Sequence, residues 1–308
     1  MRPLAQPPSL LALGGGGILG EAWMTAVLAG IEDAGGFDAR DSEHFIGTSA
    51  GSIVAAALAG GVSAGSRVGD ASRLPSLPSD DSGSESALSK LLGPALAIGG
   101  TLAAPFAALA LHSTTRPGAA ARRAALARAP VGRRSLGDLG GMIDGNGVGW
   151  DGRLLVAAVD LDSGQRQVFG ADGAPEVSVS DAVQASCAIP GVFRPVEAHG
   201  RRYVDGGVWS PTNMDAVRVA RGDFVLCLNP TGSLPFSVGT LAGALGPVSR
   251  SIAGTEALTL RHRGARVTVV NPDRAAAGAM GVNLMSPEGR GDVTAAGLAQ
   301  GRRLAGAA

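Results

Sequence analysis

The chain has 308 residues, of which 45% are hydrophobic and 17% charged. This composition excludes a disordered chain and favours a sheet covered on both faces by helices. The 26 Lys and Arg balance 26 Asp and Glu, so a net charge of zero gives no general attraction for nucleic acid. The two cysteines lack metal-ligand spacing, and the N-terminal apolar stretch is too short for a signal h-region. We expect one cytoplasmic domain over residues 1–308.

Two strand–loop–helix units open the chain. Residues 9–13 (SLLAL) predict a buried strand, the glycine run 14–17 ends it, and an apolar helix follows over about 20–34. The pattern repeats with a strand at 44–46 and a helix through 52–58. Successive units of this kind predict parallel strands joined by right-handed crossovers.

The regular pattern of strands and helices is interrupted over about residues 61–134, which we interpret as a helical insertion that resembles a lid. Within it, residues 91–111 carry no charge, but Pro94, Pro105 and a glycine pair interrupt helix continuity and argue against a membrane span. We expect 91–111 to cover the mouth of a site or to contact a membrane peripherally; the alternative is a hairpin buried on the core. Arginines in the basic alanine helix that follows would then meet anionic head groups: Arg116, Arg122, Arg123 and Arg128.

Regular patterning resumes after the insertion. We predict a helix at 181–188 with Ser180 as its N-cap, and a last helix at 293–304. Further strands are expected at 153–159, 167–169, 202–204, 224–228 and 266–270. Together these elements predict an α/β fold with a mostly parallel central sheet and helices on both faces.

Ser49 lies in the sequence Gly47-Thr48-Ser49-Ala50-Gly51, which fits GxSxG. In that motif a sharp strand-to-helix turn exposes the serine hydroxyl, and the small flanking residues Gly47 and Gly51 let the backbone turn. Residues 61–65 (GVSAG) have the same letters, but no strand precedes them and no clear helix follows. We therefore predict Ser49 as the nucleophile and Ser63 as a loop or helix-end residue.

The glycine loop at 14–20 allows two interpretations. Gly15, Gly17 and Gly20 satisfy GxGxxG, the dinucleotide fingerprint, but the acid that would bind the ribose is missing at the end of the second strand. Consecutive glycine N–H groups at a helix N-terminus also favour a negative charge, such as the tetrahedral intermediate of an ester. We favour the second interpretation, and expect no organic cofactor and no metal.

Asp205 begins the chain's single Asp-Gly-Gly sequence, after the strand predicted at 202–204. By itself this pattern indicates a turn. A serine nucleophile needs a base, however, and a carboxylate within hydrogen-bonding reach can take its proton. His199 and His262 lie in polar, Arg- or Gly-rich surroundings, so we expect them on the surface and outside a Ser-His-Asp triad.

Three motifs in order, GGGGILG at 14–20, GTSAG at 47–51 and DGG at 205–207, resemble the patatin-like phospholipase family. The segment around 186–208 also resembles the region of that family's catalytic aspartate. The resemblance implies a three-layer α/β/α fold, Ser49 as nucleophile, Asp205 as the base of a Ser-Asp dyad, and oxyanion-hole N–H groups from Gly15, Gly16 and Gly17.

The function implied by the resemblance is hydrolysis of a lipid or phospholipid carboxylic ester through an acyl-enzyme. One departure is Leu19, because the family usually has Arg or Lys just before the last glycine of the loop. We expect this change to reduce polar stabilisation near the oxyanion. It is also the one sequence feature that favours the alternative, a non-catalytic lipid-binding protein that keeps the fold.

Overall fold

The computed structural model describes residues 4–69, 116–234 and 245–306. The segment 91–111 and most of the predicted insertion lie outside this set. The described strands form one eight-stranded sheet, in which hydrogen-bonded neighbours follow the path β5-β6-β3-β2-β1-β7-β8 and β4 also pairs with β3. The strands are β1 (Leu10–Leu13), β2 (His44–Thr48), β3 (Leu154–Asp160), β4 (Arg166–Phe169), β5 (Val196–Ala198), β6 (Arg201–Asp205), β7 (Phe224–Leu228) and β8 (Arg266–Val270).

The sheet is mixed, and its centre is parallel. β3, β2, β1, β7 and β8 run in one direction, whereas β4 and β6 are antiparallel to β3 and β5 is antiparallel to β6. This arrangement confirms the α/β fold with a mostly parallel sheet. It also confirms the strands expected from apolar runs at each central position.

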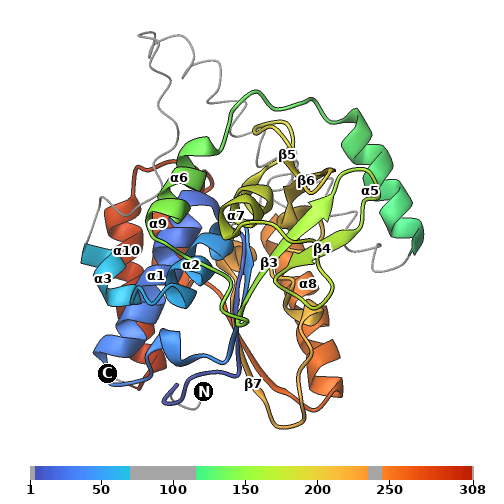
Figure 1. Cartoon of the computed structure of the whole chain (residues 1–308). Coiled ribbons are helices and arrows are strands. Elements are labelled where there is room, and N and C mark those ends of the chain that lie inside the picture. The colour runs from blue at the N-terminus through green and yellow to red at the C-terminus, as the bar shows by residue number, and fades with distance from the viewer. Residues whose placement is uncertain (1–3, 70–115, 235–244, 307–308) are drawn as a thin grey trace.

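Helices lie on both sides of the sheet (Figure 1). α1, α2, α9 and α10 gather on one side and α8 lies on the other. The described helices are α1 (Gly17–Asp33), α2 (Ala50–Ala59), α3 (Ala64–Gly69), α5 (Arg116–Arg128), α6 (Gly137–Gly145), α7 (Val179–Cys187), α8 (Leu245–His262), α9 (Arg274–Met280) and α10 (Arg290–Leu304).

Successive side chains of the central strands point to opposite faces of the sheet, so the hydrophobic core is divided between its two sides. In β1, Leu11 and Leu13 belong to the larger hydrophobic cluster with α1 and α2, and Leu10 and Ala12 belong to the cluster beneath α8. Successive strand residues point to opposite faces, so a run in which every residue is apolar is the pattern of a strand buried on both sides. The layered core therefore follows directly from the sequence of β1.

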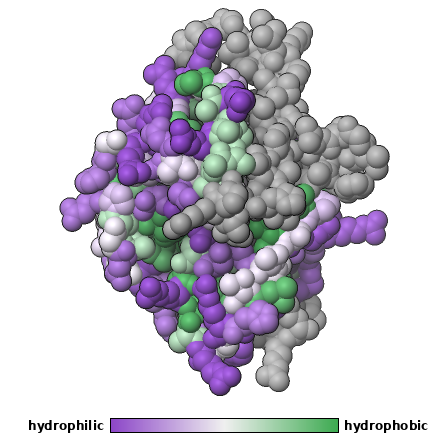
Figure 2. Space-filling model, turned by 90° about the vertical axis from the view of Figure 1, so that its right-hand side faces the viewer, coloured by the Kyte–Doolittle hydropathy of each residue, from purple (hydrophilic) through white to green (hydrophobic). Residues whose placement is uncertain are grey.

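The surface turned toward the viewer in Figure 2 is mainly hydrophilic, with smaller hydrophobic areas between polar side chains. Among the residues that the structure describes, the exposed large hydrophobic side chains lie in four separate segments: Val131, Trp150, Leu258 and Val282. Within the described ranges, no helix combines the length and the apolar character needed to cross a bilayer.

Candidate active site

Ser49 occupies a strained turn between β2 and α2. Its φ of 50° and ψ of −124° lie in a region that non-glycine residues rarely adopt, and strain of this kind concentrates at functional sites. The Ser49 N–H donates to Ser186 Oγ at 2.8 Å, and that hydroxyl donates to the Ala157 carbonyl at 2.6 Å. Ser186, on α7, therefore fastens the turn to strand β3.

Two glycines allow this turn to pack against the sheet. A Cβ at Gly51 would lie 1.9 Å from the Leu13 carbonyl oxygen, and one at Gly47 would lie 2.4 Å from Ser52 Cα. Both contacts are with backbone, which cannot rotate away as a flexible side chain would. The two glycines of the motif are thus required by close approach, as the GxSxG pattern predicts.

The sheet brings Ser49 and Asp205 together through one edge of β3. β4 pairs with Val156 to Val159 along one edge of β3. β2 and β6 pair with residues of the same stretch, so both must lie along the opposite edge. The last residue of β2, Thr48, is opposite Ala157, and the last residue of β6, Asp205, is opposite Ala158. β2 and β6 run toward each other, and their ends meet where the serine and the carboxylate are located.

Asp205 is a buried carboxylate with defined partners. Its Oδ1 accepts from the Gly207 N–H at 2.7 Å, and its own N–H donates to the Ala188 carbonyl at 3.0 Å. Burial raises its pKa to about 6, while hydrogen bonds from the Ser49 hydroxyl and the Gly207 N–H act in the opposite direction. A carboxylate with this pKa is mostly ionised at neutral pH, yet it is a stronger base than an ordinary aspartate.

The glycine loop lies beside Ser49, since a Cβ at Gly15 would be 3.4 Å from Ser49 Cβ. The Gly14 N–H donates to the Leu228 carbonyl, and the Gly15 N–H donates to the Pro211 carbonyl at 2.8 Å. The N–H groups of Gly16 and Gly17 have no acceptor among residues 4–69, 116–234 and 245–306. Both are located where α1 begins, so the helix dipole adds to their attraction for an anion.

Other candidate nucleophiles are unsuited to that role. The Cys187 thiol lies 3.9 Å from Ser52 Oγ, but burial and the neighbouring Asp205 raise its pKa strongly, so it stays protonated. Ser63 precedes α3, and its Oγ accepts from the Ser66 N–H at 3.2 Å, which makes it a helix-end residue as predicted. The expectation that no helix follows Ser63 is wrong, because α3 begins at the next residue.

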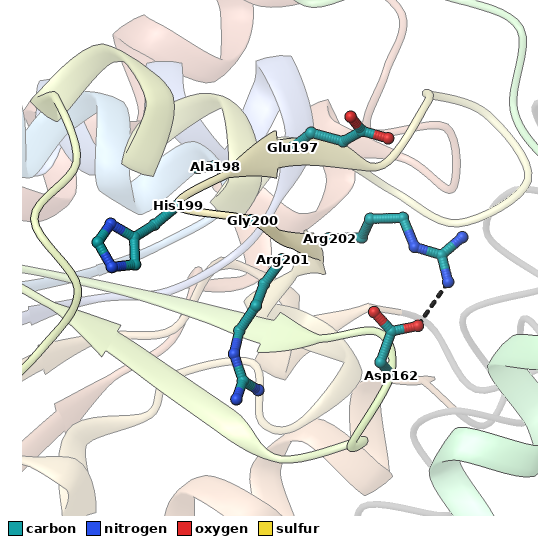
Figure 3. A pocket seen from close by; sticks show the side chains of 7 residues that line it. All are labelled: Asp162, Glu197, Ala198, His199, Gly200, Arg201 and Arg202. Carbon is teal, nitrogen blue, oxygen red and sulfur yellow. Dashed lines mark hydrogen bonds and ion pairs between the residues drawn. The ribbon is translucent and has the colours of Figure 1, made fainter.

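The histidines described by the structure are exposed and separate from the turn. His199 is located in the β5–β6 hairpin and His262 at the end of α8. A hollow of about 330 Å³ beside His199 is shown in Figure 3. Asp162, on its rim, is paired with Arg202, and the hollow is located at the end of β6 opposite to Asp205. It is therefore distinct from the site around Ser49.

The arginines of α5 differ from the expectation for head-group contact. Arg122 is fully buried, donates to the Gly164 carbonyl, and stacks on Trp209 with its Cζ 4.1 Å from the ring centroid. Arg123 and Arg128 are exposed. The prediction for Arg122 was wrong because an alanine-rich helix gives little indication of which face is buried.

Among the residues described, no three His, Cys, Asp or Glu side chains form a metal-binding group.

Two polar residues that organise the site were not predicted from the sequence. Ser186 supports the Ser49 backbone, and Asn213 donates from its amide to Thr48 Oγ1 at 3.1 Å and to the Gly206 carbonyl at 3.2 Å. The contacts span 137 residues for Ser186 and 165 for Asn213. The only signal for either was its position near the Asp-Gly-Gly sequence.

Fold and site together define a class: an α/β protein in which a strained serine follows a parallel strand and meets a buried aspartate. The family model for patatin-like phospholipases matches residues 11–218, which include the glycine loop, Ser49 and Asp205. The chain belongs to the patatin-like phospholipase family.

More distant likenesses are found among individual proteins. A segment of 62 residues is 27% identical to a probable lipid hydrolase, 463L, of Invertebrate iridescent virus 6; it covers 20% of this chain and 21% of the viral protein. The structure of VipD from Legionella pneumophila aligns with 98% of this chain and 67% of its own, with a TM-score of 0.47 and 15% identity. For the type III effector ExoU the shares are 98% and 53%, the TM-score 0.37 and the identity 17%.

Proposed function

We propose that the chain is a lipid acyl hydrolase, of the phospholipase A or lysophospholipase type, that cleaves carboxylic esters through Ser49 and Asp205. The observation that carries this proposal is the meeting of β2 and β6 on one edge of β3, which sets the strained serine beside a buried carboxylate. Membership of the patatin-like phospholipase family supports a lipid as the substrate.

In the proposed first step, Asp205 accepts the Ser49 proton while Ser49 Oγ forms a bond to the ester carbonyl carbon. The oxygen of the tetrahedral intermediate takes up the negative charge. The N–H groups of Gly16 and Gly17, which have no acceptor in the described part of the chain, are suited to stabilise it, and the Gly15 N–H fixes the loop through Pro211. The intermediate then collapses, and the departing alcohol takes the proton from Asp205.

The second step releases the acyl group. Asp205 deprotonates a water molecule, which attacks the Ser49 ester, and the collapse of this intermediate returns the proton to Ser49 and frees a fatty acid. The side chain of Leu19 is 2% exposed and packs in the main hydrophobic cluster. Charge stabilisation in this chain therefore depends on backbone N–H groups.

A covalent-trapping experiment tests the proposal. Wild type treated with a fluorophosphonate should gain one adduct on Ser49, located by peptide mass spectrometry, and should hydrolyse a p-nitrophenyl ester. Asp205→Asn keeps the acceptor for the Gly207 N–H but removes the base, so turnover should fall about a thousandfold with the fold intact. Release of fatty acid from phospholipid vesicles would then identify the substrate.

The same experiment separates the proposal from its alternative, a non-catalytic lipid-binding protein. That alternative requires vesicle binding with no Ser49 adduct and no hydrolysis above the Asp205→Asn level. A wild-type protein that behaves in this way would overturn the proposed function, whereas adduct formation on Ser49 would exclude the alternative.

A further inference from the structure

The segment that follows Asp205 contacts the residues around the proposed site, and Asn213 is its central residue. The Asn213 side chain is fully buried, and its backbone is left-handed, with a φ of 49° and a ψ of 20°. Asparagine tolerates this conformation better than most residues. A buried amide needs hydrogen-bond partners, so the contacts of Asn213 are energetically significant.

The amide nitrogen of Asn213 has three acceptors. It lies 3.1 Å from Thr48 Oγ1, 3.2 Å from the Gly206 carbonyl and 2.7 Å from the Ser210 carbonyl. Carbonyl oxygens only accept hydrogen bonds, so two of these partners require the nitrogen, and not the oxygen, to face them. The orientation of the side chain is therefore determined by its surroundings.

These contacts connect the backbone next to Ser49 with the backbone next to Asp205. Thr48 immediately precedes Ser49, and Gly206 immediately follows Asp205. β2 and β6 each pair with β3, but they form no ladder with each other because they follow one another along the same edge. The Asn213 amide supplies a direct link between the two strand ends.

The frame around Asn213 is itself fixed. Glu256 of α8 is buried, and its Oε2 accepts from the Thr212 hydroxyl and from the Met214 N–H at 3.1 Å, on either side of Asn213. The Pro211 carbonyl accepts from the Gly15 N–H of the glycine loop. A displacement of Asn213 is thus resisted from α8, and the same segment contacts all three parts of the proposed site.

We propose that Asn213 is a positioning residue, which holds Thr48 and Gly206 at a fixed separation and thereby keeps the Ser49 hydroxyl within reach of the Asp205 carboxylate. The inference rests on the proposed function. A misplacement of about 1 Å lowers the rate of such a reaction by up to about a hundredfold, so loss of the amide should slow acylation by roughly ten- to a hundredfold.

Two variants separate the amide from the backbone. Asn213→Gly keeps the left-handed conformation and removes the amide, whereas Asn213→Asp keeps the shape but sets a carboxylate against two carbonyl oxygens. Thr48→Val provides a matched variant, because it removes one acceptor and leaves Asn213 in place. Each protein is treated with a fluorophosphonate, and intact-mass spectrometry follows both the rate constant and the final number of adducts per chain.

A positioning role predicts a final stoichiometry near one adduct per chain, reached with a rate constant ten- to a hundredfold lower in Asn213→Gly and lower still in Asn213→Asp. Thr48→Val should slow the reaction in the same direction. A purely structural role predicts fewer reactive chains that each react at the wild-type rate, and that result would overturn the inference.

The positioning role can still be tested if the Asn213 variants do not fold. If neither Asn213 variant folds, Thr48→Val decides: a rate constant within twofold of wild type contradicts the positioning role. Failure of the proposed function is recognised separately, because wild type itself would then form no adduct on Ser49. Wild-type reactivity combined with unchanged variant rates would refute only the role of Asn213.

Discussion

The five-residue pattern GxSxG occurs twice in this chain, at 47–51 and 61–65, with different structural outcomes. Ser49 follows β2, adopts a positive φ and lies beside the buried Asp205. Ser63 follows the end of α2 and accepts a hydrogen bond from the Ser66 N–H as α3 begins. The same motif therefore forms a strained turn at one place in the chain and an ordinary helix start at the other.

The glycines of the two copies explain the difference. Gly51 packs so closely on the Leu13 carbonyl that a methyl group could not fit. A Cβ at Gly65, in contrast, would meet no atom of the described residues closer than Glu32 Oε2 at 3.7 Å. The motif thus acts only where a strand delivers the serine to the edge of a sheet. The preceding strand, more than the five-residue pattern, distinguishes the strained serine turn from the ordinary helix start.

The largest expected effect is that of removing each serine hydroxyl. Ser49→Ala should lower ester hydrolysis by a thousandfold or more, because it removes the proposed nucleophile of the proposed catalytic pair. Ser63→Ala should leave turnover unchanged and lower the free energy of unfolding by about 0.5–2 kcal/mol, the usual effect of losing a helix cap. Turnover and thermal unfolding of both variants measure this difference. Activity lost in Ser63→Ala and kept in Ser49→Ala would reverse the assignment.

The second comparison concerns Gly51 and Gly65. Gly51→Ala forces a methyl group against backbone, so we expect a destabilisation of roughly 3 kcal/mol, the upper part of the range for overpacking. Gly65→Ala lies within α3, where the added Cβ would make only an ordinary van der Waals contact with Glu32 Oε2, and should stabilise the helix by about 0.5–1 kcal/mol. Denaturant unfolding of the two variants gives both values. Equal destabilisation would show that the two copies pack alike.

The third prediction concerns the carboxylate next to Ser49. Burial raises the Asp205 pKa to about 6, and the carboxylate can act as the proposed base only when it is ionised. The value of kcat/KM should therefore be constant above about pH 7 and should fall about tenfold per unit below pH 6. Measurements on a soluble ester, with circular dichroism to monitor folding, test this. An inflection near the ordinary aspartate pKa would contradict the burial argument.

The smallest effect is expected for the histidines. His199→Asn with His262→Gln should leave turnover within about twofold of wild type, because both side chains are exposed and Asp205 is the proposed base. Asparagine suits the positive φ of 48° at position 199. A loss of a thousandfold would instead assign Ser49 to a triad with histidine.

Much of the fold could be predicted because the central strands contain short apolar runs: β1 and β7 consist of apolar residues alone, and β2 and β8 combine apolar with a few polar residues. β1, β2, β7 and β8 were each indicated by such a run, and the breaks at glycine and Asn-Pro located their ends. α8 was missed, since its buried face consists partly of alanines, Ala253 and Ala257, that give a weak periodic signal.

Details that depend on local hydrogen bonding were less accurate. The helix expected at 181–188 is α7, but its N-cap is Ser178, whose Oγ accepts from the Asp181 N–H at 2.9 Å, and Ser180 lies inside the helix. Two serines two positions apart both fit the sequence rule for a cap. Only the backbone conformation of Ser178, extended rather than helical, distinguishes them.

The positions of Ser49 and Asp205 in their motifs could be predicted, but the network that supports them could not. Ser186 and Asn213 act on residues 137 and 165 positions away, through the pairing of β6 with β3. Sequence periodicity is a local property and contains no information about that register. The same limitation applies to the Gly15 N–H, whose acceptor is the distant Pro211.

The shared edge of β3 also determines when during folding the protein can acquire activity. Pairings between residues distant in the chain form slowly, because closing a long loop loses entropy before contacts compensate for it. A nascent chain that has just completed β3 contains the serine turn but not β6, and so lacks the carboxylate. We expect reactivity toward a fluorophosphonate to return late in refolding, after most helical signal has recovered.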